Sequence, residues 1–263
     1  DVCSSDLGVV ESQKPTLYVI DFKGSMDAGE VTALREEVSA VLAVAEKGDE
    51  VLLRLESPGG VVHGYGLAAS QLQRLRDRGL RLTAAVDKVA ASGGYMMACV
   101  ADRIVAAPFA ILGSIGVVAQ IPNFNRLLKR NDIDVELHTA GQYKRTLTLF
   151  GENTDEGREK FQEDLNETHL LFKEFVHQMR PSLDIDKVAT GEHWYGRQAL
   201  ALNLIDDIST SDELIISQMD VFNVLGVHYA RRRKMIDRVT HSAGSVAERL
   251  LMKWWQRGEK PLL

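Results

Sequence analysis

The sequence predicts an α/β fold in which a mostly parallel sheet is covered by helices. Two observations carry this prediction: strand-like and helix-like segments alternate along residues 16–220, and the strands are apolar almost throughout. Such alternation is typical of parallel sheets whose two faces are both covered. The 263 residues are 45% apolar and 26% charged, the balance of an ordinary globular chain, which excludes disordered, collagen-like and coiled-coil proteins.

The first half of the chain supplies most of the expected elements. Residues 16–22 (TLYVIDF) are β-branched and aromatic and end near a Gly-Ser turn, so they favour a strand. Apolar residues spaced by three and four predict a helix over Ala28–Glu46, with Asp27 as its cap and Gly48 as its stop. The further strands expected here are Val51–Leu55, Leu80–Val86 and Arg103–Ala106, and the further helices are His63–Arg78 and Tyr95–Ala101.

Two more elements are expected further along the chain. The segment Ile133–His138 alternates apolar and polar residues and predicts a strand. A long helix is predicted from the capping sequence at 153–156 (NTDE) to a stop at Pro181. Its apolar stripe steps by three and four residues through Phe161, Leu165, Thr168, Phe172, Phe175 and Met179.

The chain is expected to have three parts. We interpret residues 1–15 as a linker, residues 16–220 as one α/β domain and residues 221–263 as a basic, partly helical tail. From residue 228 onward nine Lys/Arg stand against three Asp/Glu, although the net charge of the whole chain is −6. An acidic body argues against nucleic acid as the main partner. The amphipathic tail fits a lipid surface, and it equally fits packing on the body or on a neighbouring protomer.

The longest uncharged run, Ile104–Asn125, is interpreted as buried core, because Pro, Gly, Ser and Asn interrupt it and disfavour insertion into a membrane. No signal peptide is visible, and the chain itself is expected to be soluble. Cys3 and Cys99 are too few for a disulfide framework, and Cys99 is expected to pack in the core. No metal-ligand spacing or phosphate loop is present in the sequence, so neither a metal nor a cofactor is expected.

Two turns of small residues are the candidate functional elements. The turns Ser57–Gly60 and Ala90–Gly94 each follow a predicted strand and precede a predicted helix. Glycine at such a place lets backbone N–H groups face a ligand oxygen, and two converging N–H groups would form an oxyanion hole. Ser92 stands in the second turn, where a sharp strand-to-helix bend exposes a nucleophilic hydroxyl. The alternative is that both are simply tight turns and that Ser92 caps a helix.

A nucleophilic serine needs a base. Spacing does not exclude His63 or His138, because catalytic groups are assembled in space. The histidines on the long helix (His169, His177) and near the tail (His228, His241) are poor candidates. A lysine can also act as the base once desolvation favours its neutral form, and Lys144 is one candidate among many lysines.

Five short motifs stand in a characteristic order: Ser57–Gly60, Ala91–Tyr95, Gly113–Val117, Tyr143–Lys144 and Trp194–Ala199. Through them the chain, from Asp21 to about Ile208, resembles the signal peptide peptidase A family of serine peptidases, and among these the SohB-type members. The resemblance implies a ClpP/crotonase-like fold and a serine–lysine dyad.

Within that dyad the resemblance implies Ser92 as nucleophile and Lys144 as general base. It further implies that Ser114 orients the lysine and that Gly60 and Gly93 supply the oxyanion N–H groups, although Gly59 stands beside Gly60. The sequence departs from the family pattern where Glu56 replaces an Asn commonly found before the first turn.

The resemblance also implies a ring-like homo-oligomer in which neighbouring protomers share each active site. It implies a location at the bacterial inner membrane through an N-terminal anchor that these residues do not include, and substrates that are hydrophobic or unfolded peptides. Three rivals stay open: a Clp-type protease with a histidine base, a crotonase-type acyl-CoA enzyme, and a non-catalytic membrane-associated peptide-binding scaffold.

Overall fold

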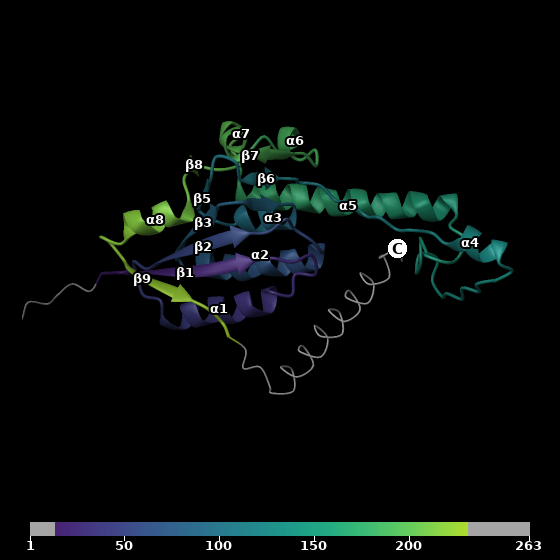
Figure 1. Cartoon of the computed structure of the whole chain (residues 1–263), viewed down its shortest axis with the longest axis horizontal. Coiled ribbons are helices and arrows are strands. Elements are labelled where there is room, and N and C mark those ends of the chain that lie inside the picture. Colours follow the sequence, from purple (N-terminus) through teal and green to yellow (C-terminus); the bar gives the residue numbers. More distant parts are fainter. Residues whose placement is uncertain (1–13, 231–263) are drawn as a thin grey trace, which may run out of the picture. The chain divides into compact units, whose positions relative to one another are not determined.

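A computed structural model describes residues 14–230, and two sheets organise this part of the chain. The strands are β1 (Thr16–Lys23), β2 (Glu50–Glu56), β3 (Arg81–Val86), β4 (Val89–Ala91), β5 (Arg103–Ala106), β6 (Ile111–Gly113), β7 (His193–Tyr195), β8 (Asp207–Ile208) and β9 (Asn223–Val227). Six of them form a parallel sheet in the order β8-β5-β3-β2-β1-β9, and the other three form a smaller sheet in the order β4-β6-β7 (Figure 1).

Short loops join β3 to β4 and β5 to β6, whereas every connection between consecutive strands of the large sheet contains helices, as parallel neighbours require. The helices are α1 (Val31–Val44), α2 (Val62–Asp77), α3 (Gly93–Ala98), α4 (Asn125–Arg130), α5 (Asp155–Met179), α6 (Ile185–Val188), α7 (Gly196–Ala201) and α8 (Ser211–Gln218). The predicted class, a mostly parallel sheet covered by helices, is therefore confirmed.

Side-chain alternation along the strands decides which helices cover which face of the large sheet. In β1, Tyr18, Ile20 and Phe22 belong to the main core together with residues of α1, α2 and α3. Leu17 and Val19 point to the opposite face, into a smaller cluster that includes Leu214 of α8. Because a strand has a period of two, its apolar run is buried on both faces.

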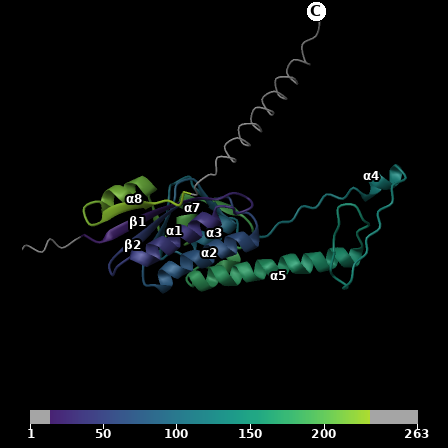
Figure 2. The ribbon, with the colours of Figure 1, turned by 90° about the horizontal axis from the view of Figure 1, so that it is seen from below.

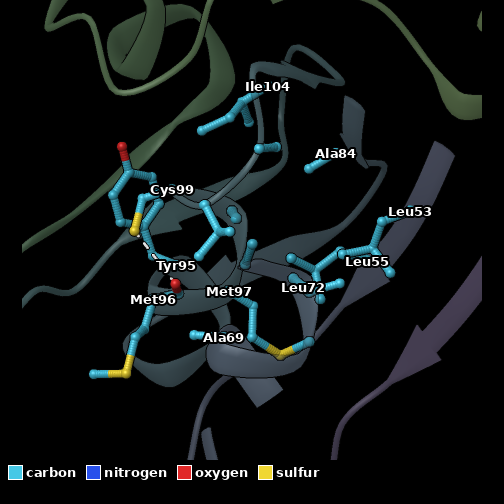
Figure 3. Close-up of a cluster of buried hydrophobic side chains, with 14 of the residues drawn as sticks. Leu53, Leu55, Ala69, Leu72, Ala84, Tyr95, Met96, Met97, Cys99 and Ile104 are labelled. Carbon is cyan, nitrogen blue, oxygen red and sulfur yellow. Dashed lines mark hydrogen bonds between the residues drawn. The ribbon is translucent and has the colours of Figure 1, made fainter. Parts of the chain in front are cut away.

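Helix α3 is buried along its whole length, and this anchors the turn that precedes it. In Figure 3, Met97 of α3 lies among apolar side chains of α2, β2 and β3. The prediction that Cys99 is a packing residue is confirmed, because its side chain is fully buried and its thiol contacts the Met96 carbonyl at 3.3 Å. Burial raises the pKa of this thiol to about 12, so Cys99 is not a nucleophile at neutral pH.

The elements predicted up to residue 106 are confirmed, with ends displaced by a few residues. The predicted cap of the first helix is wrong, because α1 begins after Glu30 without a side-chain cap and Asp27 accepts from the Ser25 hydroxyl instead. The long helix is also confirmed: α5 begins after Thr154, whose hydroxyl accepts from the Gly157 N–H at 3.1 Å, and ends before Pro181. The strand predicted over Ile133–His138 is wrong, since these residues are exposed and not in a strand. The alternating pattern has no neighbouring strand to pair with, and an isolated strand is not stable in water.

Residues 117–153 form an arm that extends away from the sheets, with α4 at its far end. Figures 1 and 2 both show α4 near the N-terminal end of α5, far from the large sheet. The interpretation of Ile104–Asn125 as buried core is confirmed for most of residues 104–115 and wrong for 118–124, which are exposed. Over the described residues, none of the helices combines the length and the apolar character needed to cross a membrane. Within the basic tail predicted over residues 221–263, residues 223–227 form β9 of the large sheet, and residues 231–263 lie outside the described residues.

The C-terminal end of α5 is tied to the body by one ion pair. The guanidinium of Arg180 donates to both carboxylate oxygens of Asp206, at 2.8 and 2.9 Å, and Asp206 also accepts from the Ile104 N–H at 2.7 Å. The Arg180 side chain is only 9% exposed. Burial alone would raise the pKa of Asp206, but the hydrogen bonds from Arg180 and Ile104 outweigh burial and hold it below the ordinary 3.8.

We expect Asp206→Asn to lower the free energy of unfolding by about 2 kcal/mol at pH 7, because it leaves the buried Arg180 charge uncompensated. Since the folded-state pKa of Asp206 is depressed, the contribution of the carboxylate is present above the unfolded-state pKa. The difference between wild type and variant should therefore shrink as the pH falls below about 4. Urea unfolding at pH 7 and pH 3 measures it.

Asp207→Asn is the matched control for this prediction. Asp207 also pairs with an arginine, Arg103, at 2.9 Å, but its side chain is 54% exposed. An exposed pair contributes on the order of 0.5 kcal/mol or less. Equal losses for the two variants at pH 7 would contradict the anchoring role of Asp206.

Candidate active site

Ser92 occupies a strained turn between β4 and α3. Its backbone has φ 52° and ψ −120°, a conformation that residues with a side chain rarely adopt. The Ser92 N–H donates to the Gly113 carbonyl at 2.8 Å, and its carbonyl accepts from the Met96 N–H at 3.0 Å, so the turn is held on both sides. The prediction of a sharp strand-to-helix bend at Ser92 agrees with this geometry.

The glycines around Ser92 are required by close packing. A Cβ at Gly93 would lie 2.4 Å from Tyr65 Cγ, and one at Gly94 would lie 2.3 Å from the Ser57 carbonyl oxygen. Either distance is far shorter than a carbon atom tolerates. Only glycine lets the N-terminus of α3 approach α2 and the end of β2 this closely.

The second glycine turn lies directly against the first. Gly59 has φ 91°, and a Cβ there would come within 2.7 Å of both Ser92 Cβ and the Gly93 nitrogen. The Gly59 N–H donates to Ser57 Oγ at 3.1 Å. By contrast, the N–H groups of Gly60 and Gly93 have no hydrogen-bond acceptor among residues 14–230.

A cavity of about 660 Å³ opens beside these turns. Ser92, Gly60, Gly93 and Ser114 all line it, so the structure brings four of the five predicted site residues together. Ser114 follows β6 with φ 51°, and its N–H donates to the Glu192 carbonyl. The apolar part of the lining comes from Met26, Val61, Val62, Met96, Val117, Val118 and Phe172.

Lys144, the fifth predicted residue, lies in the arm and does not line this cavity. It is exposed, in a turn where its N–H donates to the Gly141 carbonyl at 3.2 Å. Neither of the two open histidine candidates lines the cavity: His63 is exposed on α2, and His138 is exposed in the arm near Glu136. The described part of a single chain therefore holds the nucleophile candidate without a predicted base beside it.

His169 of α5 is a cavity residue that the sequence analysis set aside. It lines the cavity with Thr168 and Phe172, and its Nε2 lies 3.2 Å from the Ile115 carbonyl oxygen. One signal could have found it, because His169 stands three residues before Phe172 and so lies on the predicted apolar stripe of the long helix.

Glu56, the departure from the family pattern, pairs outside the cavity. Its carboxylate accepts from Lys88 at 3.1 Å and lies 3.5 Å from Lys23. The Lys88 hydrogen bond lowers the pKa of Glu56. Trp194 packs over Gly113, where a Cβ would lie 2.7 Å from its ring, so it braces the turn after β6. Among the residues that the structure describes, no group of His, Cys, Asp and Glu could hold a metal ion.

Two family models match the chain: Peptidase family S49 over residues 74–225 and Peptidase family S49 N-terminal over residues 4–72. The chain belongs to peptidase family S49. It is a serine peptidase by class, which confirms the suspected resemblance and decides against an acyl-CoA enzyme.

Two similar proteins carry names that are consistent with this family. The "Probable protease SohB" of Haemophilus influenzae is 60% identical over 244 residues, which are 93% of this chain and 69% of the relative. The "Probable protease SohB" of Buchnera aphidicola subsp. Schlechtendalia chinensis is 68% identical over 209 residues, which are 80% of this chain and 68% of the relative.

A solved structure of 1510-N, a membrane-bound stomatin-specific protease, matches with a TM-score of 0.55 and 12% identity, over 82% of this chain and 99% of that one. A second structure of that protease, in complex with a substrate peptide, matches with a TM-score of 0.53 and 13% identity, over 87% and 99% of the two chains. This likeness confirms the expected ClpP-like α/β fold.

The backbone strain at Ser92 predicts an unusual order of stabilities. Ser92→Gly should have a free energy of unfolding about 1 kcal/mol higher than Ser92→Ala, because glycine adopts φ 52° without a Cβ penalty. Thermal or urea unfolding of the two purified variants measures the difference.

Ser39, in the middle of α1, provides the control. Its backbone is helical, so Ser39→Gly should be about 1 kcal/mol less stable than Ser39→Ala, the opposite order. If Ser92→Gly were also the less stable of its pair, the turn at Ser92 would not be strained.

Proposed function

We propose that the chain is a serine endopeptidase in which Ser92 is the nucleophile and Lys144 of a neighbouring protomer is the general base. The observation that carries this proposal is the strained Ser92, flanked by the unpaired N–H groups of Gly60 and Gly93 at the wall of one cavity. Strain of this kind persists where function needs it. Unpaired backbone donors next to a nucleophile are the arrangement that acyl transfer requires.

In the first half of the reaction, the Ser92 oxygen bonds to the substrate carbonyl carbon while neutral Lys144 takes the hydroxyl proton. The carbonyl electron pair moves onto its oxygen, where the Gly60 and Gly93 N–H groups donate hydrogen bonds to the negative charge. As the C–N bond breaks, the Lys144 ammonium returns the proton to the leaving amine. Water then repeats the sequence on the acyl-Ser92 and restores the free serine.

The arm supports the proposal that the lysine comes from another protomer. Large apolar side chains of the arm are exposed, among them Val118 (90%), Leu127 (56%) and Leu137 (53%). A surface this apolar is typical of a protein–protein interface. Packing against a second copy would remove water around Lys144, which favours the neutral amine that a general base must be. We therefore propose a ring-like homo-oligomer with shared active sites.

Ser114 is proposed to hydrogen-bond the incoming lysine. It lines the cavity on the segment that follows β6, and its left-handed backbone turns the chain at that position. A hydroxyl can accept from an ammonium and donate to a neutral amine, so it can orient the lysine in both protonation states.

The substrate is proposed to be a hydrophobic or unfolded peptide. Apolar side chains from the first turn, α3 and α5 line the cavity beside Ser92, and such surface binds apolar residues of a peptide. We further propose that the protein acts near the bacterial inner membrane, as the resemblance to signal peptide peptidases implies. Fractionation of cells that express the protein at its native level tests this location.

The decisive experiment labels the purified protein with a fluorophosphonate and locates the adduct by mass spectrometry. We expect the adduct on Ser92 in the wild type, none in Ser92→Ala, and labelling slowed by at least about 100-fold in Lys144→Ala, because base catalysis contributes on that order. Cleavage of casein and of an apolar peptide should fall in parallel. Lys129→Ala, another exposed lysine of the arm, is the control and should react like the wild type.

Labelling and cleavage that both survive in Ser92→Ala would overturn the proposal. Light scattering shows whether the protein is an oligomer. If the oligomer binds peptide but is neither labelled nor active, the result favours the non-catalytic scaffold instead.

Mixing the two inactive variants tests where the lysine comes from. If Lys144 acts on a neighbour's serine, hybrid oligomers of Ser92→Ala and Lys144→Ala contain some sites with both groups intact. Co-expression of the two variants should then restore a part of wild-type peptidase activity. If serine and lysine act within one chain, no hybrid site is complete and the mixture stays inactive.

A further inference from the structure

Behind the two glycine turns, three hydrogen bonds, two of them buried and one partly buried, connect Gly59 to Ser25 through Ser57 and Tyr65 of α2. The Gly59 N–H donates to Ser57 Oγ at 3.1 Å, Ser57 Oγ lies 2.6 Å from Tyr65 Oη, and Tyr65 Oη donates to the Ser25 carbonyl at 2.8 Å. Ser57 and Tyr65 are both fully buried. Bonds in such a place are not exchanged with water and are costly to lose.

The number of protons fixes the direction of each bond. Tyr65 has one hydroxyl proton, which goes to the Ser25 carbonyl, so its oxygen accepts from the Ser57 hydroxyl. Ser57 Oγ in turn accepts from the Gly59 N–H. Burial raises the pKa of the Tyr65 phenol, which therefore keeps its proton at neutral pH. Every hydroxyl proton in the chain has an acceptor, so the network has one stable arrangement.

The ring of Tyr65 contacts the other turn directly. A Cβ at Gly93 would lie 2.4 Å from Tyr65 Cγ, which means that the Gly93 backbone rests on the ring. One side chain thus holds the turn of Gly59 and Gly60 by hydrogen bonds and the turn of Ser92 and Gly93 by van der Waals contact.

The bond to Ser25 brings in a third loop. The next residue, Met26, accepts from the Val61 N–H at 2.9 Å, and a Cβ at Gly60 would lie 2.1 Å from the Met26 carbonyl oxygen. Gly60 is therefore enclosed between Met26 and the bonded Gly59. Tyr65 is connected to Gly59 through Ser57, and to Met26 through its hydrogen bond to the preceding residue, Ser25.

We propose that Tyr65, acting through Ser57, is a positioning residue that sets the spacing between the N–H groups of Gly60 and Gly93 in the oxyanion hole. This inference rests on the proposed function of Ser92. Tyr65 is not among the residues that line the cavity, so its effect reaches the substrate only through the two turns. Oxyanion donors act over about 2.7–3.1 Å, and a misplacement of about 1 Å can cost on the order of 100-fold in rate.

The test is Tyr65→Phe, which keeps the ring contact with Gly93 and removes only the hydroxyl. We expect kcat for peptide cleavage to fall by about 10- to 100-fold with KM changed by less than about threefold, since the oxyanion forms only in the transition state. Fluorophosphonate labelling of Ser92 and binding of a peptide aldehyde should weaken by a similar factor. Peptide binding in the Ser92→Ala background should not change.

Tyr95→Phe is the matched control. Tyr95 is also fully buried, and its hydroxyl donates to the Leu204 carbonyl at 2.7 Å, away from both turns. We expect both variants to lose stability, and we expect Tyr95→Phe to keep the wild-type kcat. Equal losses of kcat in the two variants would show a general effect of a lost buried hydroxyl and would overturn the inference.

Ser57→Ala removes the middle of the chain and provides a second route to the same result if Tyr65→Phe does not fold. In the double variant the loss of kcat should not exceed the larger single loss, because both changes break one network. If the wild type is labelled at Ser92 and a folded Tyr65→Phe is labelled equally fast, the inference is wrong and the proposed function stands. If the wild type is not labelled at all, the proposed function fails and this inference fails with it.

Discussion

The site depends on the close approach of two turns, one that follows β2 of the large sheet and one that follows β4 of the small sheet. Ser57 bridges Ala90 in parallel: its N–H donates to the Val89 carbonyl at 2.8 Å, and its carbonyl accepts from the Ala91 N–H at 3.0 Å. These bonds form an isolated parallel bridge between the two sheets, one residue beyond the end of β2, and bring the following glycines against Ser92. Because no Cβ fits between the turns, small residues at this contact are a steric requirement, and the free N–H groups at the cavity are its consequence.

The packing of α3 keeps Ser92 in its strained backbone conformation. That helix is short but completely buried, and α2, α5 and β2 pack against it. A well-packed core resists deformation, so it holds the preceding residue in a conformation that a surface turn would relax. Figure 3 shows this packing around Met97 and Cys99. The hydrogen bond between the buried hydroxyls of Ser57 and Tyr65 also fixes the orientation of the first glycine turn, because hydrogen bonds depend on direction and apolar contacts do not.

The body and the arm of the chain carry different parts of the proposed active site. The body between β1 and α3 provides the rigid turns, whereas residues 117–153 extend from it and expose apolar side chains together with Lys144 (Figures 1 and 2). Helix α5 connects the two: its C-terminal end is tied through Arg180 to Asp206, and Phe172 and His169 line the cavity. Under the proposed function, a lone protomer would hold the nucleophile without its base, so assembly would control activity.

The sequence by itself determined the local elements, because their signals lie within a few residues of each other. The Thr154 cap, the apolar stripe of α5 and the glycine turns around Ser92 are all visible in the printed chain. Tertiary structure alone decided the rest. Residues 133–138 have a strand pattern and no strand to pair with, whereas His169 becomes a cavity residue through contact with Ile115, 54 positions away. Tyr65 contacts Gly93 and bonds to Ser25, 40 positions away in the sequence, only because the tertiary fold brings them together. Long-range pairing, which no local pattern encodes, selects which of these residues come together.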